Sequence, residues 1–192
     1  MFSSELIFTM EPLETDRLLL RRLEMADAQD IFDYGRDPDV ARHVLWEAYR
    51  SVGECRSYIR GMVRRYRSGE PSSWGIEYKE TGRIVGTIGY MWFQPDHNSA
   101  EVGYSLAHGL WNRGLMTEAL RAVIAYSFEE LRLNRVEAQH ELTNPASGAV
   151  MKKCGMQYEG TLRQRLYNKG AYVDVALYSI LRSEYRSRVM QG

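Results

Sequence analysis

The chain has 192 residues, a length that suits one domain with a core of its own. Hydrophobic residues make up 44% and charged residues 26%, which excludes an intrinsically disordered chain. The 25 Lys and Arg balance the 25 Asp and Glu, and this zero net charge argues against general binding to nucleic acid or to an anionic membrane.

Membrane and metal signals are also missing from the sequence. No apolar run approaches the roughly 20 residues that cross a bilayer, and the first apolar stretch lacks the basic start of a secretory signal. Cys55 and Cys154 lie far apart without zinc spacing, and the four histidines show no metal-site pattern either. We therefore expect a cytoplasmic protein with free, buried thiols and no metal.

The chain divides into an N-terminal leader over 1–12, flexible at least in part, one domain over 13–185, and a charged tail over 186–192. The first half of the domain predicts one strand, two helices and a hairpin of two further strands. These elements are a strand over 15–23, helices over 25–34 and 51–68, and strands over 73–78 and 84–93.

The predicted helix that begins at Ser51 has the clearest start signal in the chain. Ser51 and Glu54 have the spacing of a capping box, and Gly69 and Pro71 end the helix. Its arginines form a stripe opposite the apolar face. That stripe is either a solvated helix face or the border of a site for an anionic acceptor. It comprises Arg56, Arg60, Arg64 and Arg67.

The second half alternates strands and helices before it ends in a hairpin. The elements are a strand over 100–107, a helix over 116–131, a strand over 136–142, a helix over 145–154, and hairpin strands over 158–167 and 172–181. This order predicts an α/β class with a mixed α+β layer, in which a mostly antiparallel sheet carries a parallel insertion and is flanked by helices.

A possible anion site precedes the helix over 116–131. There a strand leads through Trp111-Asn-Arg-Gly-Leu-Met116 into a helix N-terminus, whose unpaired N–H groups and dipole favour negative charge. Gly114 allows close approach of the backbone, and Arg113 adds positive charge, which together suit a phosphate group. An ordinary strand–loop–helix joint remains the alternative, since one glycine is common at such joints.

Asn144 and Ser147 form a second polar pair at the start of the helix over 145–154. Asn144 is either a ligand contact or an ordinary helix N-cap. Ser147 lacks the Gly-x-Ser-x-Gly context of a hydrolase nucleophile.

Five segments together resemble the GNAT family of N-acetyltransferases, in its RimJ/RimL-like branch that acetylates ribosomal-protein N-termini. They occur in the family's order and spacing and span nearly the whole chain, from Thr15 to about Arg182. The segments are TDRLLLRRL at 15–23, EVGYSL at 101–106, WNRGLMTEA at 111–119, NPASGAVMKKCGM at 144–156 and YVDVALYSIL at 172–181.

The resemblance implies a GNAT fold that binds acetyl-CoA between two splayed strands, over 100–107 and 136–142. In the family's diphosphate loop this chain keeps the central Gly114 but has Trp111 at the first position and Met116 at the last. The family also implies that an N–H group near Ser105–Ala107 polarises the thioester carbonyl. The implied coenzyme-binding residues are Ser105, Leu106, Ala107, Trp111, Asn112, Arg113, Gly114, Leu115, Met116, Thr117, Asn144 and Ser147.

The implied reaction is direct attack of an amine on the thioester, which needs a base for the amine and an acid for the departing thiolate. Met151 stands where many family members have the acidic Tyr, so Ser147 is the alternative donor. Glu101 is the expected base, although a surface carboxylate with no catalytic role is the other interpretation. Leu166 replaces a glutamate of the RimL type, and Asp174 is expected to be structural.

We therefore predict an acetyl-CoA-dependent N-acetyltransferase whose acceptor is a protein N-terminus or a small amine. A non-catalytic CoA-binding sensor and an enzyme for longer acyl groups are the alternatives. No nucleic-acid or membrane partner is expected, and exposed strand edges would allow a homodimer.

Overall fold

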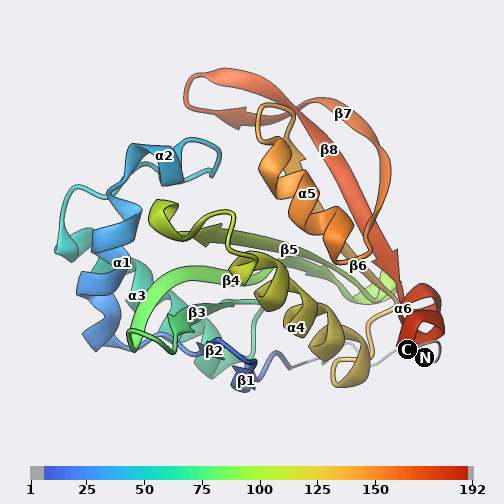
Figure 1. The fold of residues 1–192 in the computed structure, drawn as a ribbon, viewed down its shortest axis with the longest axis horizontal. Coiled ribbons are helices and arrows are strands. Elements are labelled where there is room, and N and C mark those ends of the chain that lie inside the picture. The colour runs from blue at the N-terminus through green and yellow to red at the C-terminus, as the bar shows by residue number, and fades with distance from the viewer. Residues whose placement is uncertain (1–6, 190–192) are drawn as a thin grey trace.

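The fold is built on one mixed sheet of eight strands among the described residues, 7–189 of the computed structural model (Figure 1). The strand order is β1-β2-β3-β4-β5-β6-β8-β7, and only the β5–β6 pair is parallel. This confirms the expected class. The strands are β1 Leu13–Glu14, β2 Leu18–Arg21, β3 Ser73–Tyr78, β4 Arg83–Gln94, β5 Ser99–Leu106, β6 Arg135–Glu141, β7 Gln157–Asn168 and β8 Ala171–Leu181.

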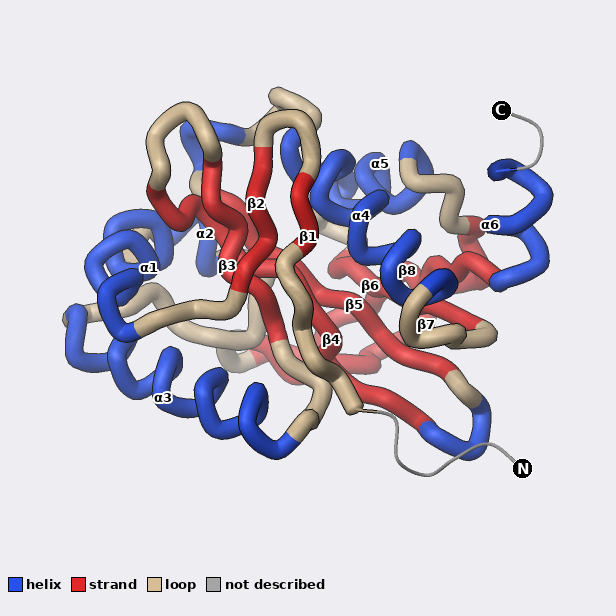
Figure 2. The backbone as a smooth tube through the Cα atoms, turned by 90° about the horizontal axis from the view of Figure 1, so that it is seen from below, coloured by secondary structure: helices blue, strands red, loops and turns tan. Residues whose placement is uncertain are grey.

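Helices cover both faces of the sheet. Helices α1 and α3 lie on one side, and α4 and α5 lie on the other (Figure 2). The helices are α1 Ala28–Gly35, α2 Pro38–Ala41, α3 Val52–Ser68, α4 Leu115–Glu129, α5 Pro145–Lys153 and α6 Arg182–Val189, with 3-10 turns at Met25–Asp27, Pro95–His97 and His108–Leu110. The sequence did not predict α2 or α6.

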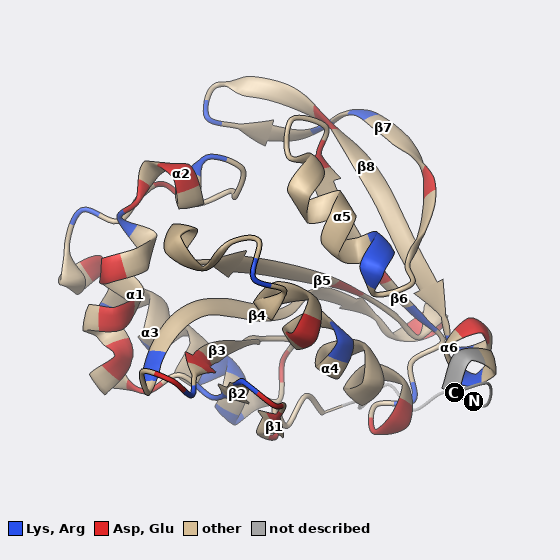
Figure 3. Cartoon of the chain, viewed as in Figure 1, with Lys and Arg blue, Asp and Glu red and all other residues tan. Residues whose placement is uncertain are grey.

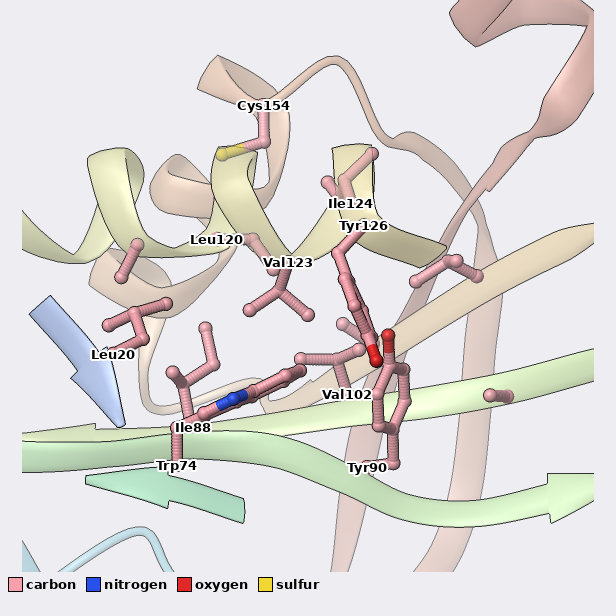
Figure 4. Packing of buried hydrophobic residues seen from close by; sticks show 14 of the residues in the cluster. Leu20, Trp74, Ile88, Tyr90, Val102, Leu120, Val123, Ile124, Tyr126 and Cys154 are labelled. Carbon is pink, nitrogen blue, oxygen red and sulfur yellow. The ribbon is translucent and has the colours of Figure 1, made fainter. Parts of the chain in front are cut away.

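The larger core lies between α4 and the sheet. Trp74 and Tyr90 project from β3 and β4 towards α4, and Figure 4 shows them beneath Leu120 and Val123. The Tyr90 hydroxyl pairs with Ser127 Oγ at 2.6 Å, so this buried polar atom is satisfied. The burial of these large side chains is the main stabilising contribution on this face.

Residues 7–12 run along the sheet and contribute two side chains to this core, which differs from the flexible leader expected there. Phe8 and Met10 have no exposed surface. Trp74 Nε1 donates to the Glu11 carbonyl at 2.9 Å, which holds this segment along the sheet. Residues 1–6 lie outside the described residues. At the other end, α6 continues through 189 into the region expected to be a tail.

The first predicted strand, over 15–23, is shorter in the structure, because its first residues form a turn and β2 covers only Leu18–Arg21. The Thr15 N–H donates to the Leu18 carbonyl at 2.9 Å, and the Thr15 hydroxyl accepts from the Leu18 N–H at 3.1 Å. These bonds close a turn between β1 and β2. A threonine hydroxyl can compete with sheet pairing in this way. The apolar run alone therefore did not show that the strand begins only at Leu18.

The parallel pair β5–β6 separates after three residues. Ser99, Ala100 and Glu101 pair with Arg135, Val136 and Glu137, and no further pairs follow. From Val102 onward, the side of β5 that faces β6 has no strand partner, while β6 continues along β8. The splayed pair implied by the family resemblance is therefore present.

No helix among residues 7–189 combines the length and apolar character needed to cross a membrane.

A substitution at Gly86 tests how closely the backbone of β4 packs against the end of β5. A Cβ at Gly86 would lie 2.3 Å from the Ser105 carbonyl oxygen. We expect Gly86→Ala to destabilise the fold by about 1–3 kcal/mol, because backbone cannot move aside as a side chain can. Gly61 in α3 has nothing within 4 Å, so Gly61→Ala should instead stabilise by about 0.5–1 kcal/mol. Urea midpoints measure both, and an unchanged midpoint for Gly86→Ala would contradict the prediction.

Candidate active site

The loop between β5 and α4 forms a concave backbone site. Asn112 and Gly114 both adopt left-handed conformations, with φ of 61° and 78°. Asparagine and glycine tolerate this region, and such residues turn successive N–H groups towards one point. Gly114 is the N-cap of α4 and makes no side-chain cap bond, so the first amides of the helix have no side-chain cap. The loop therefore suits an anion, as expected.

Trp111 attaches this loop to the end of β5. Its indole N–H donates to the Leu106 carbonyl at 2.8 Å, and its ring contacts His108 with a centroid distance of 4.3 Å. His108 Nδ1 in turn lies 3.5 Å from an Asp37 carboxylate oxygen, and α2 begins at the next residue, Pro38. The tryptophan at this family position thus has a structural function, and its contact with the coenzyme stays a prediction.

Only part of the expected β5 edge is free. The Ala107 N–H donates to the Val85 carbonyl at 2.8 Å, so this amide does not face the gap between β5 and β6. Among the three residues expected to offer an N–H group here, Ala107 is instead paired with β4, because this pairing extends one residue past β5. Main-chain groups alternate in direction along a strand, so Leu106 and Tyr104 point their N–H groups to the unpaired side. Ser105 Oγ lies 3.2 Å from Thr87 Oγ1.

The N-terminus of α5 places Ser147 beside a phenol from β5. Asn144 Oδ1 accepts from the Ser147 N–H at 3.4 Å, so Asn144 is the N-cap. The Tyr104 hydroxyl lies 3.0 Å from Ser147 Oγ and donates to the Ser147 carbonyl at 3.1 Å. Burial raises the pKa of Tyr104 above its ordinary value, so the phenol stays protonated. Sequence reasoning missed Tyr104, because its contact with α5 is made only in the tertiary fold.

Glu101 lies where β5 and β6 stop pairing. It is 9% exposed and accepts hydrogen bonds from Trp92 Nε1 at 2.9 Å and from Gln139 Nε2 at 3.1 and 3.2 Å. Burial raises the pKa of Glu101, although the Trp92 and Gln139 bonds oppose this rise. A buried carboxylate held by two neutral donors is consistent with a base rather than with a solvated surface group.

Glu101 and Tyr104 occupy opposite faces of β5, because neighbouring side chains along a strand alternate and these positions differ by three. Val102, on the Tyr104 face, belongs to the core under α4. The two side chains therefore approach the gap between β5 and β6 from opposite faces of the sheet. This arrangement can remove a proton on one side of an acyl group and supply a proton on the other.

Three other ionisable side chains have partners within the fold. Asp174 Oδ1 accepts from the Gln164 N–H at 2.7 Å in a bulge of β7, in keeping with the structural role expected of it. His43 Nδ1 lies 2.9 Å from Glu141 Oε2. Burial tends to raise the pKa of Glu141, but the His43 and Asn168 bonds lower it overall.

A sheet that opens beside a glycine loop at a helix start is the arrangement that the family resemblance implies for an acyltransferase that uses coenzyme A. The sequence matches the acetyltransferase (GNAT) domain family over residues 17–157. It is 34% identical to an uncharacterized N-acetyltransferase of Bacillus licheniformis, p20, over 92% of this chain and 99% of that one. It is 29% identical to the ribosomal-protein-serine acetyltransferase of Escherichia coli, over 68% of this chain and 72% of that one.

Solved structures share the fold. A GNAT-family acetyltransferase from Bacillus anthracis aligns with a TM-score of 0.81 at 24% identity, covering 91% of this chain and 100% of that one. RimL, a ribosomal L7/L12 alpha-N-protein acetyltransferase solved with coenzyme A, aligns with a TM-score of 0.80 at 22% identity, covering 89% and 98%. The chain belongs to the GNAT family, and acetyl-CoA is its co-substrate.

The environment of Glu101 predicts an altered titration. We expect its carboxyl to titrate above the ordinary glutamate range, because burial penalises the charged form. Gln139→Leu should raise this pKa further, since it removes a donor to the carboxylate. A ¹³C NMR titration measures both values, with Glu101→Gln to assign the resonance and exposed Glu47→Gln as the control. An ordinary pKa in the wild-type protein would show that Glu101 is solvated.

Proposed function

We propose that this enzyme acetylates the primary amine of a protein N-terminus by direct attack on the thioester of acetyl-CoA. The observation that carries the proposal is the placement of Glu101 and the Ser147–Tyr104 pair on opposite sides of the opened β5 strand. The relative named a ribosomal-protein-serine acetyltransferase supports a protein acceptor. Direct transfer needs no nucleophilic side chain and no covalent intermediate on the protein.

The residues that would hold the coenzyme fit its chemistry. Loop amides around Gly114 and the start of α4 suit the diphosphate, and the free N–H groups of Tyr104 and Leu106 suit the amides of the pantetheine arm. Acetyl-CoA supplies the activated acyl group. The unpaired β5 edge would position it, and one of these edge amides would stabilise charge on the thioester oxygen.

Glu101 would act as the base, directly or through a water molecule. Its burial favours proton uptake, and the Trp92 and Gln139 bonds hold the carboxylate in one orientation. Leu166 offers no carboxylate, so position 166 in the β7–β8 hairpin cannot supply the base, and this proposal assigns that role to Glu101 alone. The rate should therefore fall as Glu101 becomes protonated at low pH.

Ser147 would donate the proton to the departing thiolate, with Tyr104 as its positioning residue. Met151 cannot donate a proton, so the hydroxyl pair takes the place of the usual tyrosine. The Tyr104 hydroxyl can donate to Ser147 Oγ when the serine proton turns towards sulfur. The proton that Ser147 gives to sulfur would then be replaced by the Tyr104 proton, and the phenol would regain a proton from solvent before the next turnover.

Substitution of the three groups tests these roles. We expect Glu101→Gln to lower kcat about 100-fold, the lower end of the range for general acid–base catalysis. Ser147→Ala or Tyr104→Phe should lower kcat only about 10-fold each, because a thiolate is a good leaving group and needs less help from an acid. Because the two hydroxyls act as one unit, the Ser147→Ala/Tyr104→Phe double variant should lose little more than either single variant. Thiol release with acetyl-CoA and a panel of N-terminal peptides measures kcat.

The controls for this experiment are the exposed Ser57→Ala and Tyr158→Phe, which should retain wild-type kcat. An acidic limb of the pH–rate profile that persists in Glu101→Gln would contradict the role of Glu101 as the base. Turnover with small amines and none with peptides would overturn the protein acceptor and leave the chemistry of the site intact.

A further inference from the structure

The turn between β1 and β2 makes an extensive contact with the coenzyme loop. Within the TDRL segment, the Arg17 guanidinium donates through Nε to Glu118 Oε2 at 2.7 Å, and its Nη2 lies 2.7 Å from the same oxygen. Its Nη1 donates to the Arg113 carbonyl at 2.9 Å. One side chain therefore connects the first turn of α4 with the loop residue just before Gly114.

Glu118 is the receiving group of this contact. Its Oε1 accepts from the Thr15 hydroxyl at 2.6 Å and from the Arg17 N–H at 2.9 Å, in addition to the guanidinium bonds at Oε2. Burial tends to raise the pKa of Glu118, but the Thr15 and Arg17 bonds lower it below the ordinary value. The carboxylate thus stays charged and holds the turn, and Figure 3 shows both signs of charge along α4.

The bond to the Arg113 carbonyl has a stereochemical consequence. A trans peptide group is planar, and its C=O and N–H point in opposite directions. The Arg113 carbonyl and the Gly114 N–H belong to one such group. When Arg17 holds the carbonyl on its own side, the Gly114 N–H must point away from Arg17. Without this bond, the group could rotate freely, because the φ of a glycine is poorly restricted.

The same guanidinium lies beside a surface cavity at the start of α4. A cavity of about 670 Å³ is lined by Arg17, Gly114, Thr117, Glu118, Arg121 and Lys153, among others. Arg17 Nη2 would be the nearest atom to a Cβ at Gly114, at 3.5 Å. An exposed ion pair of this kind contributes little to stability, which does not account for a side chain that bonds both the Glu118 carboxylate and the Arg113 carbonyl.

We propose that Arg17 is a positioning residue for the coenzyme, which orients the Arg113–Gly114 peptide group so that the loop amides converge on the diphosphate. The proposal rests on the diphosphate-binding role proposed above for this loop. It assigns to the TDRL segment a function in binding, although that segment lies about 100 residues from the loop in sequence. Arg17 has no part in proton transfer, so it should affect coenzyme affinity and leave kcat at saturation nearly unchanged.

The test compares ligands with and without the diphosphate. Isothermal titration of Arg17→Ala should show at least 10-fold weaker binding of coenzyme A and unchanged binding of pantetheine, relative to wild type. Arg17→Lys should bind coenzyme A as weakly as Arg17→Ala, because a lysine cannot donate to Glu118 and to the Arg113 carbonyl in the same fork geometry. In ¹⁵N spectra of the free protein, the Gly114 amide resonance should move in both variants.

Lys79→Ala is the matched control. Lys79 Nζ holds the same turn from the other side, through Glu14 Oε1 at 2.7 Å and the Thr15 carbonyl at 2.6 Å, and has no bond to α4. This variant should leave both affinities and the Gly114 resonance unchanged.

Two outcomes would contradict the proposal, and a third would contradict the function on which it rests. Wild-type affinity for coenzyme A in Arg17→Ala would overturn it, and an equal loss for coenzyme A and pantetheine would reduce Arg17 to a general structural residue. Failure of the wild-type protein to bind coenzyme A would instead overturn the proposed function of the loop itself. The wild-type titration therefore separates the two failures.

Discussion

The separation of β5 from β6 after Glu101 is the constraint on which the site depends. Three residue pairs join these parallel strands, and the remaining N–H and C=O groups of β5 on that side are left without a strand partner. Unpaired backbone groups inside a protein are costly unless something bonds to them. The Leu106 carbonyl accepts a hydrogen bond from the Trp111 indole, whereas the Ala107 N–H lies on the other side of the strand and pairs with β4. The groups that remain are those suited to an extended, amide-bearing ligand.

This opening also places the two proposed proton-transfer groups where they need not touch each other. The alternation of side chains along β5 sends Glu101 to one face and Tyr104 to the other, where α5 brings Ser147 to its hydroxyl. The substitution of methionine at position 151 removes the usual phenol from α5. The phenol of Tyr104 reaches nearly the same helix turn from β5, so a change of residue at one position need not remove the chemistry.

Support for the coenzyme loop comes from segments distant in sequence. Gly86 lies against the Ser105 carbonyl, His108 connects the loop to the residues before α2, and Arg17 holds the Arg113 carbonyl. A loop with two left-handed residues has little regular hydrogen bonding of its own. Contacts from the surrounding elements therefore determine its conformation, which is the usual requirement for a preorganised binding site.

Local patterns were sufficient to predict most helices and strands, because apolar periodicity and caps such as Ser51 depend on neighbouring residues. The roles expected of Glu101 and Ser147 came from the family resemblance and stay predictions, whereas the local patterns also indicated the Gly114 loop. They did not predict the turn at Thr15, the short helix α2, the burial of Phe8, the use of the Ala107 amide or the partnership of Tyr104 with Ser147. Each of these depends on a hydrogen bond or a packing contact that forms only when segments distant in sequence come together in the fold. Such contacts leave no periodic trace in the sequence, so only the tertiary structure decided them.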